Sequence, residues 1–166
     1  MSEESEFTFE KSVDGSTTTI TMRGIINEKT PFNEVFSGLE GEKLVVDLAG
    51  ITRINSIGIR EWINAIRNLD ESIELEYTGC SIFIVRQLNM IVNFLTRGCI
   101  HSFYAPYLCR KCNSEKAVLL QVDEVMEYNS NNPGISPPPA SCPQCGTEMS
   151  FNENPQKYFF FLNRDG

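Results

Sequence analysis

The sequence predicts an α/β fold, in which helices pack on a mixed, largely parallel sheet, followed by a small β-rich module. Two observations support this prediction. Over residues 5–105, short apolar segments typical of strands alternate with amphipathic segments typical of helices. After residue 106 the composition changes, and two closely spaced cysteine pairs flank a loop rich in Asn, Pro, Ser and Gly. We therefore expect two units, residues 1–106 and residues 107–166.

The strands of the first unit are predicted from alternation and from apolar runs. Residues 7–11 and 16–25 alternate with a period near two, and Asp14-Gly15 between them is a hairpin signal. Residues 43–48 form a short apolar run typical of a buried strand, and residues 73–77 again have strand composition. Strands alternating with helices in this order indicate a mixed, largely parallel sheet.

An amphipathic helix is predicted to begin near Ser56. Its apolar positions recur at i, i+3, i+4 and i+7, and charged or amide side chains fall between them. The apolar positions are Ile59, Trp62, Ile63 and Ile66, and the polar positions are Arg60, Glu61, Asn64 and Arg67. We expect Ile59, Ile63 and Ile66 to pack on the sheet, with the polar positions facing solvent or a partner.

Further elements are predicted before and within the cysteine-rich region. Residues 82–96 read as a helix that ends at Gly98, with an apolar face of Phe83, Leu88, Ile91, Val92 and Leu95. Residues 30–39 can form a short helix. In the second unit, strands are expected at Ala117–Val125 and Tyr158–Leu162, on either side of the loop Tyr128–Ala140.

The charge of the chain disfavours two classes of partner. The formal net charge is −8, and neither unit has more Lys and Arg than Asp and Glu. Nucleic acids and anionic membrane surfaces select basic proteins, so we expect neither as a partner. Residues 1–6 resemble no secretory signal, and no apolar run approaches the roughly 20 residues of a membrane helix. We therefore expect a protein of the reducing cytoplasm, where disulfides are rare.

Four of the six cysteines have the spacing of a metal site. Cys109-Arg-Lys-Cys112 and Cys142-Pro-Gln-Cys145 are both C-x-x-C turns, in which two thiolates converge on one cation. Two such turns complete a tetrahedral shell of four sulfurs around Zn²⁺, which leaves no open position for water. The pattern therefore predicts one structural zinc ion per chain in a zinc ribbon. Redox-active pairs, disulfides and an iron–sulfur cluster are the alternatives.

The remaining cysteines and the single histidine have no such pattern. Cys80 and Cys99 lack a partner at metal-ligand spacing, and we expect each to be a small buried residue. With four thiolates available to a metal, His101 is not needed as a ligand, and we interpret it as structural.

Two short motifs in the first unit carry a resemblance to a known family. Asn55-Ser56-Ile57-Gly58 follows a buried strand and opens a helix, and Gly24-Ile25-Ile26-Asn27 ends an earlier strand. Over roughly residues 5–105 the chain resembles the STAS domain of sulphate transporters and anti-sigma-factor antagonists. The resemblance implies a STAS-like mixed sheet with packed helices. It does not cover the cysteine-rich region.

The resemblance also implies a functional site. In phosphorylated members of the family, the Ser of this motif is the acceptor for a partner kinase and lies on the surface that binds it, which points to Ser56. The partner-binding candidates are Asn27, Asn55, Ser56, Gly58 and Arg60. The chain departs from the family in having Asn55, and also Asn27, where Asp is common, so its site is less acidic. Independently, Asn or Ser at this position can simply cap the helix.

We predict a regulatory protein of bacterial type that acts by binding another protein, with Ser56 as a switch. The partner is a kinase-like anti-sigma factor or a signalling scaffold. The chain has one His, no P-loop and no dinucleotide-binding glycine pattern, so we do not expect this protein to be an enzyme. The alternatives are a constitutive interaction module without phosphorylation, a nucleic-acid-associated ribbon factor and a small-ligand sensor. The sequence does not specify the oligomeric state.

Overall fold

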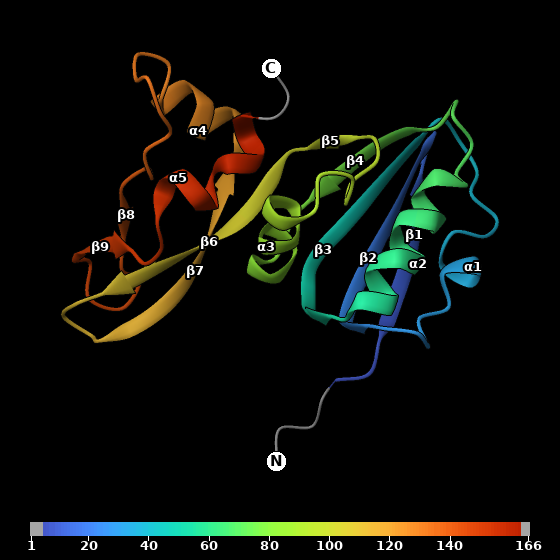
Figure 1. Cartoon of the computed structure of the whole chain (residues 1–166), viewed down its shortest axis with the longest axis horizontal. Coiled ribbons are helices and arrows are strands. Elements are labelled where there is room, and N and C mark those ends of the chain that lie inside the picture. Colours follow the sequence, from blue (N-terminus) through green and yellow to red (C-terminus); the bar gives the residue numbers. More distant parts are fainter. Residues whose placement is uncertain (1–4, 164–166) are drawn as a thin grey trace.

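The chain folds around two β-sheets in a computed structural model that describes residues 5–163 (Figure 1). The first sheet has strand order β1-β2-β3-β4-β5, and the second has order β7-β6-β9-β8. The strands are β1 Thr8–Asp14, β2 Thr17–Ile26, β3 Lys43–Ile54, β4 Glu74–Thr78, β5 Cys99–Ile100, β6 Ser102–Cys109, β7 Ser114–Gln121, β8 Ala140–Ser141 and β9 Glu148–Phe151. The helices are α1 Phe32–Val35, α2 Ser56–Arg67, α3 Ile82–Met90, α4 Val122–Tyr128, α5 Pro155–Tyr158 and the 3₁₀ helix η1 Phe160–Asn163.

The first sheet confirms the predicted α/β class. β1 and β2 form an antiparallel hairpin, and β2, β3, β4 and β5 are parallel neighbours. The three crossovers between the parallel strands contain α1, α2 and α3 in turn. Since parallel crossovers are right-handed and these all step in one direction, the helices share one face of the sheet, as Figure 1 shows.

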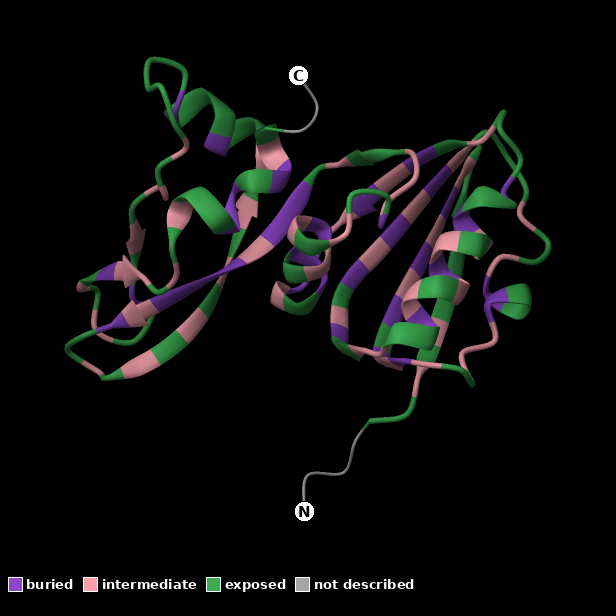
Figure 2. Cartoon of the chain, viewed as in Figure 1, coloured by how far each residue is buried: buried purple, intermediate pink, exposed green. Residues whose placement is uncertain are grey.

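Alternating burial identifies the helix-covered face. Successive residues of β2 and β3 are buried and half-buried in turn, visible as the banding of these strands in Figure 2. Trp62 of α2 lies at the centre of this core, with its ring 6.3 Å from that of Tyr77 and 5.9 Å from that of Phe94. The opposite face, where Lys43 and Glu76 form an ion pair of 2.6 Å, is not covered by these helices.

Strand β3 is longer than the predicted strand 43–48. Beyond its pairing with β4, it continues beside β2 as far as the pair Ile26 and Ile54. The chain therefore passes directly from the strand into Asn55 and the start of α2.

The prediction of a helix over residues 82–96 is wrong in its second half, because α3 ends at Met90. Phe94 is fully buried against the Trp62 ring, and its carbonyl accepts a hydrogen bond of 3.0 Å from Trp62 Nε1. The backbone leaves the helical conformation at Ile91, where φ is −120° and ψ is 111°. As a result, Val92 is 75% exposed and does not belong to a buried helix face.

The predicted inward stripe of α2 is only partly right. The buried residues of this helix are Gly58, Trp62 and Ile66, whereas Ile59 and Ile63 are half-buried. The inward stripe is thus rotated by about one residue from the predicted one. Arg60 and Arg67 are exposed, as expected.

The cysteine-rich part contains helices where two strands were predicted. β7 ends at Gln121 and is followed by α4, so the strand expected at Ala117–Val125 is shorter. Tyr158–Leu162 is not a strand but the end of α5 and most of η1. The Asn154 side chain accepts a hydrogen bond from Lys157 N, and Pro155 occupies the first helical turn, which favours a helix start.

Helix α3 joins the two sheets. Its Asn89 side chain donates to Tyr158 O at 2.8 Å and accepts from Phe161 N at 2.9 Å, and its Arg86 pairs with Glu153. Residue 106, the expected boundary, lies in the middle of β6. Among the described residues, no helix has the length and apolar character to cross a membrane. Of residues 1–6, considered above for a secretory signal, residues 1–4 lie outside the described range.

Candidate metal centre and the start of helix α2

The four paired cysteines come together at the far end of the second sheet. Cys109 ends β6 and Cys112 lies in the turn that leads to β7, and Cys142 and Cys145 lie between β8 and β9. All four sulfurs lie within 4.8 Å of one another. The Sγ–Sγ distances are 3.5 Å for Cys109–Cys145 and 4.0 Å for Cys112–Cys142. A tetrahedral shell with Zn–S bonds of about 2.3 Å requires sulfurs about 3.8 Å apart, so the donors fit one such ion.

Each cysteine pair is held by a tight turn. The Cys112 N–H points to Cys109 Sγ at 3.4 Å, and the Gly146 N–H donates to Cys142 O at 2.9 Å. Gly146 has a φ of 71°, a conformation that a residue with a Cβ rarely adopts. The turns therefore direct two sulfurs each toward a common centre.

The surroundings of the second pair favour thiolates. The hydroxyl and N–H of Thr147 donate to Cys145 and lower the pKa of its thiol to about 6. The backbone N–H groups of Cys145 and Gln144 lower the pKa of Cys142. The pKa of Cys112 is raised to about 12, first because its thiol hydrogen-bonds to Cys145. The cluster thus suits a soft cation, which a thiolate binds after losing its proton.

The two other cysteines differ in environment. Cys80 is fully buried, as predicted, and burial raises the pKa of its thiol to about 12. Cys99 is exposed on the short edge strand β5, so the prediction that it is buried was wrong. His101 follows that strand, and its Nε2 lies 3.2 Å from Glu76 on the open face of the sheet.

The start of α2 is capped by Asn55 and not by Ser56. The Asn55 Oδ1 accepts a hydrogen bond of 2.7 Å from Gly58 N, and the Asn55 N–H donates to Ile26 O. Ser56 is the first helical residue and is exposed. Its hydroxyl forms no hydrogen bond with another described residue. The side chain of Ser56 is therefore not needed to hold the helix.

A carboxylate that the sequence analysis missed lies at this helix start. Asn55 Nδ2 donates to Glu28 Oε2 at 2.8 Å, and this bond is the first cause of the lowered pKa of Glu28. An amide can cap Gly58 with its oxygen and bind Glu28 with its nitrogen, whereas an Asp would oppose Glu28 with a like charge. No local sequence pattern marks Glu28, because the contact depends on the end of β2 lying beside the end of β3.

The other candidate residues surround Asn55 and Ser56. A Cβ at Gly58 would lie 2.7 Å from Ile26 O, so this glycine lets α2 pack directly on the end of β2. The Asn27 side chain accepts from Lys29 N at 2.9 Å and holds the local turn. Arg60 is exposed one turn into the helix, with Glu61 at 3.5 Å. The structure thus brings all five candidates to one end of the sheet.

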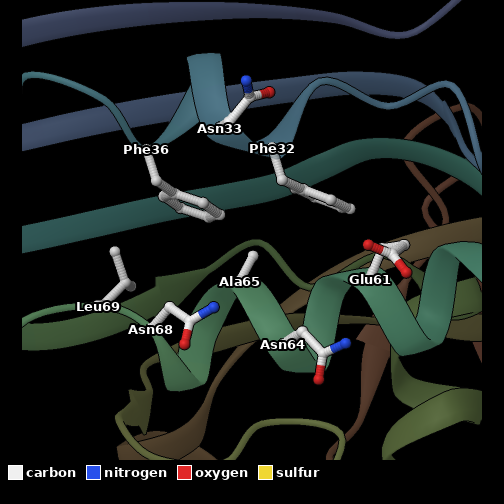
Figure 3. A pocket seen from close by; sticks show the side chains of 8 residues that line it. All are labelled: Phe32, Asn33, Phe36, Glu61, Asn64, Ala65, Asn68 and Leu69. Atoms are coloured by element: carbon white, nitrogen blue, oxygen red, sulfur yellow. The ribbon is translucent and has the colours of Figure 1, made fainter.

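Two depressions flank α2. One, of about 420 Å³, lies between α2 and residues 91–93, and we call it the α2 groove. It is lined by Ser56, Ile59, Arg60, Ile63, Asn64, Arg67, Ile91, Val92 and Asn93. The other, of about 360 Å³, lies between α1 and α2, where Figure 3 shows the rings of Phe32 and Phe36 extending toward the helix. The α2 groove is lined by Ile59, Ile63 and Arg67 of the helix, whereas the other depression is lined by Glu61, Ala65 and Asn68, so the two lie on different flanks of α2.

No protein-family model matches the chain, and no curated protein matches it significantly. Among solved structures, it is similar to an anti-sigma factor antagonist from Mycobacterium paratuberculosis, with 14% sequence identity and a TM-score of 0.49. The match covers 57% of this chain and 86% of that one.

Proposed function

We propose that this chain is a regulatory protein of a bacterial-type cytoplasm that acts by binding another protein through the start of α2. The binding surface consists of Asn27, Asn55, Ser56, Gly58 and Arg60. The partner is a kinase-like anti-sigma factor or a signalling scaffold, and the chain itself catalyses no reaction. Phosphorylation of Ser56 switches the interaction.

The observation that carries this proposal is the free hydroxyl of Ser56. Ser56 is exposed, and its hydroxyl forms no hydrogen bond with another described residue. Because Asn55 supplies the cap, Ser56 can accept a phosphoryl group without loss of the helix start. The hydroxyl oxygen attacks the terminal phosphoryl group of ATP on the kinase, ADP leaves, and the proton passes to a base of the kinase. The phosphoserine adds a charge of about −1.5 to −2 to the binding surface of this chain.

Two features of the helix favour the phosphorylated form. The first-turn N–H groups of a helix lack intrahelical partners and stabilise an anion. Arg60 lies four residues after Ser56, the spacing at which side chains on a helix face each other. Glu28 acts in the opposite direction, because its carboxylate lies beside Asn55 and repels a phosphate. The attraction by the helix N–H groups and Arg60, set against the repulsion by Glu28, determines how stable the phosphorylated form is.

The second unit, residues 107–166, is proposed to hold one structural zinc ion through Cys109, Cys112, Cys142 and Cys145. The support is the convergence of four sulfurs at tetrahedral spacing. All four positions of the ion would be filled by the protein. The ion would therefore stabilise the turns on both sides of the second sheet and carry out no reaction.

The experiment is a quantitative pull-down from the native host with wild-type chain, Ser56→Asp and Ser56→Ala, combined with phosphosite mass spectrometry. We expect a phosphate on Ser56 in the wild type and at least tenfold less partner on Ser56→Asp. Ser56→Ala should retain the partner, because Asn55 still caps the helix. Lys116→Glu, on the distant strand β7, controls for a general effect of charge.

Two results would contradict the proposal in different ways. Partner capture by Ser56→Asp within twofold of wild type, lost instead on replacing the cysteines, would place the binding surface on the second unit. Partner capture that Arg60→Ala abolishes, with no phosphate on Ser56, would identify a constitutive interaction module.

A further inference from the structure

We propose that the α2 groove binds an amphipathic helix of the partner, with acidic residues two turns apart on either side of an apolar centre. This inference rests on the proposed role in protein binding and specifies the chemistry of the partner. The groove begins at Ser56 and is therefore continuous with the proposed binding surface.

The groove has an apolar floor that is already formed. Ile59 and Ile63, four residues apart on α2, are half-buried along one wall, and Ile91 and Val92 form the other. Val92 is 75% exposed, so its side chain is accessible to a partner beside Ile59 and Ile63. The second wall is anchored because Phe94 is fully buried on Trp62 just beyond it. A partner would therefore bind without having to order this segment first.

The charge around the groove is opposite to that of the chain. The net charge is −8, yet the described residues that line the groove include Arg60 and Arg67 and no carboxylate. Arg67 has no ion pair with a described residue, and Arg60 has only the exposed contact with Glu61 at 3.5 Å, a kind of pair that contributes little. The two guanidinium groups are thus available to carboxylates of a partner.

The spacing of these residues fits a helix. Arg60 and Arg67 are seven residues apart, or about 10 Å along α2, which equals two turns of a partner helix. Residues 56–67 line the groove over roughly 16–18 Å, the length of about three turns. Both walls present side chains and no free strand edge. An extended peptide would leave its backbone groups unpaired there, whereas a helix satisfies its own.

The depression on the other flank of α2 lacks this pattern. It contains Glu61 and three amide side chains, and no Arg or Lys lines it. Its lining residues therefore serve as an internal reference for where a partner helix binds.

The test uses a displayed library of 14-residue helical peptides, with the residues of one face randomised and the full-length chain as bait. We expect binders to the wild type to be enriched in Asp or Glu at two positions seven apart, with apolar residues between them. Against the Arg60→Glu/Arg67→Glu variant, the same positions should be enriched in Lys or Arg. Arg23→Glu, an exposed arginine of β2 away from the groove, should select the wild-type pattern.

The strongest wild-type binder is then examined by ¹⁵N chemical-shift mapping and by affinity measurement. Shifts should concentrate on Ile63, Arg67 and Val92 and leave Asn33 and Leu69 unchanged, and the double Arg variant should lose at least tenfold in affinity. No acidic enrichment, equal binding by the double variant, or shifts centred on the α1 flank would each overturn the inference. None of these results depends on phosphorylation of Ser56, so failure here is distinct from failure of the proposed switch.

Discussion

At the scale of single residues, the amide at position 55 shapes the candidate site. Asn55 Oδ1 caps the helix through Gly58 N, and Asn55 Nδ2 binds the Glu28 carboxylate. An Asp at position 55 would place a second carboxylate opposite Glu28 at hydrogen-bond distance, so the amide suits this neighbour better. The sequence motif located the helix start but could not reveal Glu28, since that contact is made between the ends of two strands.

We predict that Asn55→Asp raises the pKa of Glu28, because a donor is replaced by a like charge. Asn55→Ser is the matched control: it keeps a capping oxygen, removes the donor, and should raise that pKa less. NMR titration of the Glu28 side chain measures the change. In the wild type the lowered pKa stabilises the fold above the usual carboxyl pKa, and this contribution is lost as pH falls through the lowered value. An unchanged titration in Asn55→Asp would contradict the pairing.

At the scale of elements, strand and helix positions in the first unit were largely predictable, whereas helix orientation, helix ends and the C-terminal helices of the second unit were not. The helical period of α2 does not distinguish the predicted inward stripe from the observed one, which is rotated by about one residue. The observed stripe faces inward because Trp62 fills the centre of the core. Likewise, the apolar residues after Met90 are compatible with a longer helix when only the sequence is considered, but the helix ends because Phe94 packs on Trp62. Both differences are tertiary contacts that a local pattern does not contain.

The rotated stripe gives a stability prediction. Ile66→Ala removes a fully buried side chain and should lower the free energy of unfolding by about 2–5 kcal/mol. Ile63→Ala, at a half-buried position in the α2 groove, should cost about 1 kcal/mol, because much of that side chain remains in contact with water. Urea unfolding of the two variants compares them directly. A larger loss for Ile63→Ala would show that the stripe predicted from the sequence is the buried one.

At the scale of the whole molecule, the cysteine-rich part contains an aromatic core. The rings of Phe103, Tyr107, Phe151, Tyr158, Phe159 and Phe161 form a chain of contacts at centroid distances of 5.1–6.0 Å. These aromatic residues come from β6, β9 and the C-terminal helices, so no local window of sequence contains the cluster. That the four cysteines come together could be predicted from the sequence, because the metal-ligand spacing within each C-x-x-C pair is local.

The metal prediction is tested by elemental analysis. Protein purified without added zinc should contain about one zinc ion per chain, and Cys142→Ser should contain little, because a tetrahedral shell loses one of its four ligands. Cys99→Ser alters an exposed cysteine outside the cluster and should bind zinc as the wild type does. Disulfides within the C-x-x-C pairs, with no bound metal, would contradict the assignment.

Removing the metal should loosen the molecule in a graded way. β9 pairs with β6 at only two positions, Tyr107 with Phe151 and Leu108 with Ser150, so the cysteine turns and β8–β9 depend most on the ion. Residues 153–162 are also held by the bonds of Asn89 and by the aromatic contacts, and should lose less protection. β2 and β3 are held by their own strand pairing and by packing around Trp62, and should be unaffected.

Hydrogen exchange before and after chelation measures this order for each segment. We expect large increases in exchange over residues 109–112 and 140–151, moderate increases over 153–162, and none over β2 and β3. Cys142→Ser should reproduce the same order without chelator. A uniform increase that includes β2 and β3 would show instead that the two sheets unfold as one unit. Helix α3, which contacts both, would then transmit the effect of metal removal to the packing around Trp62.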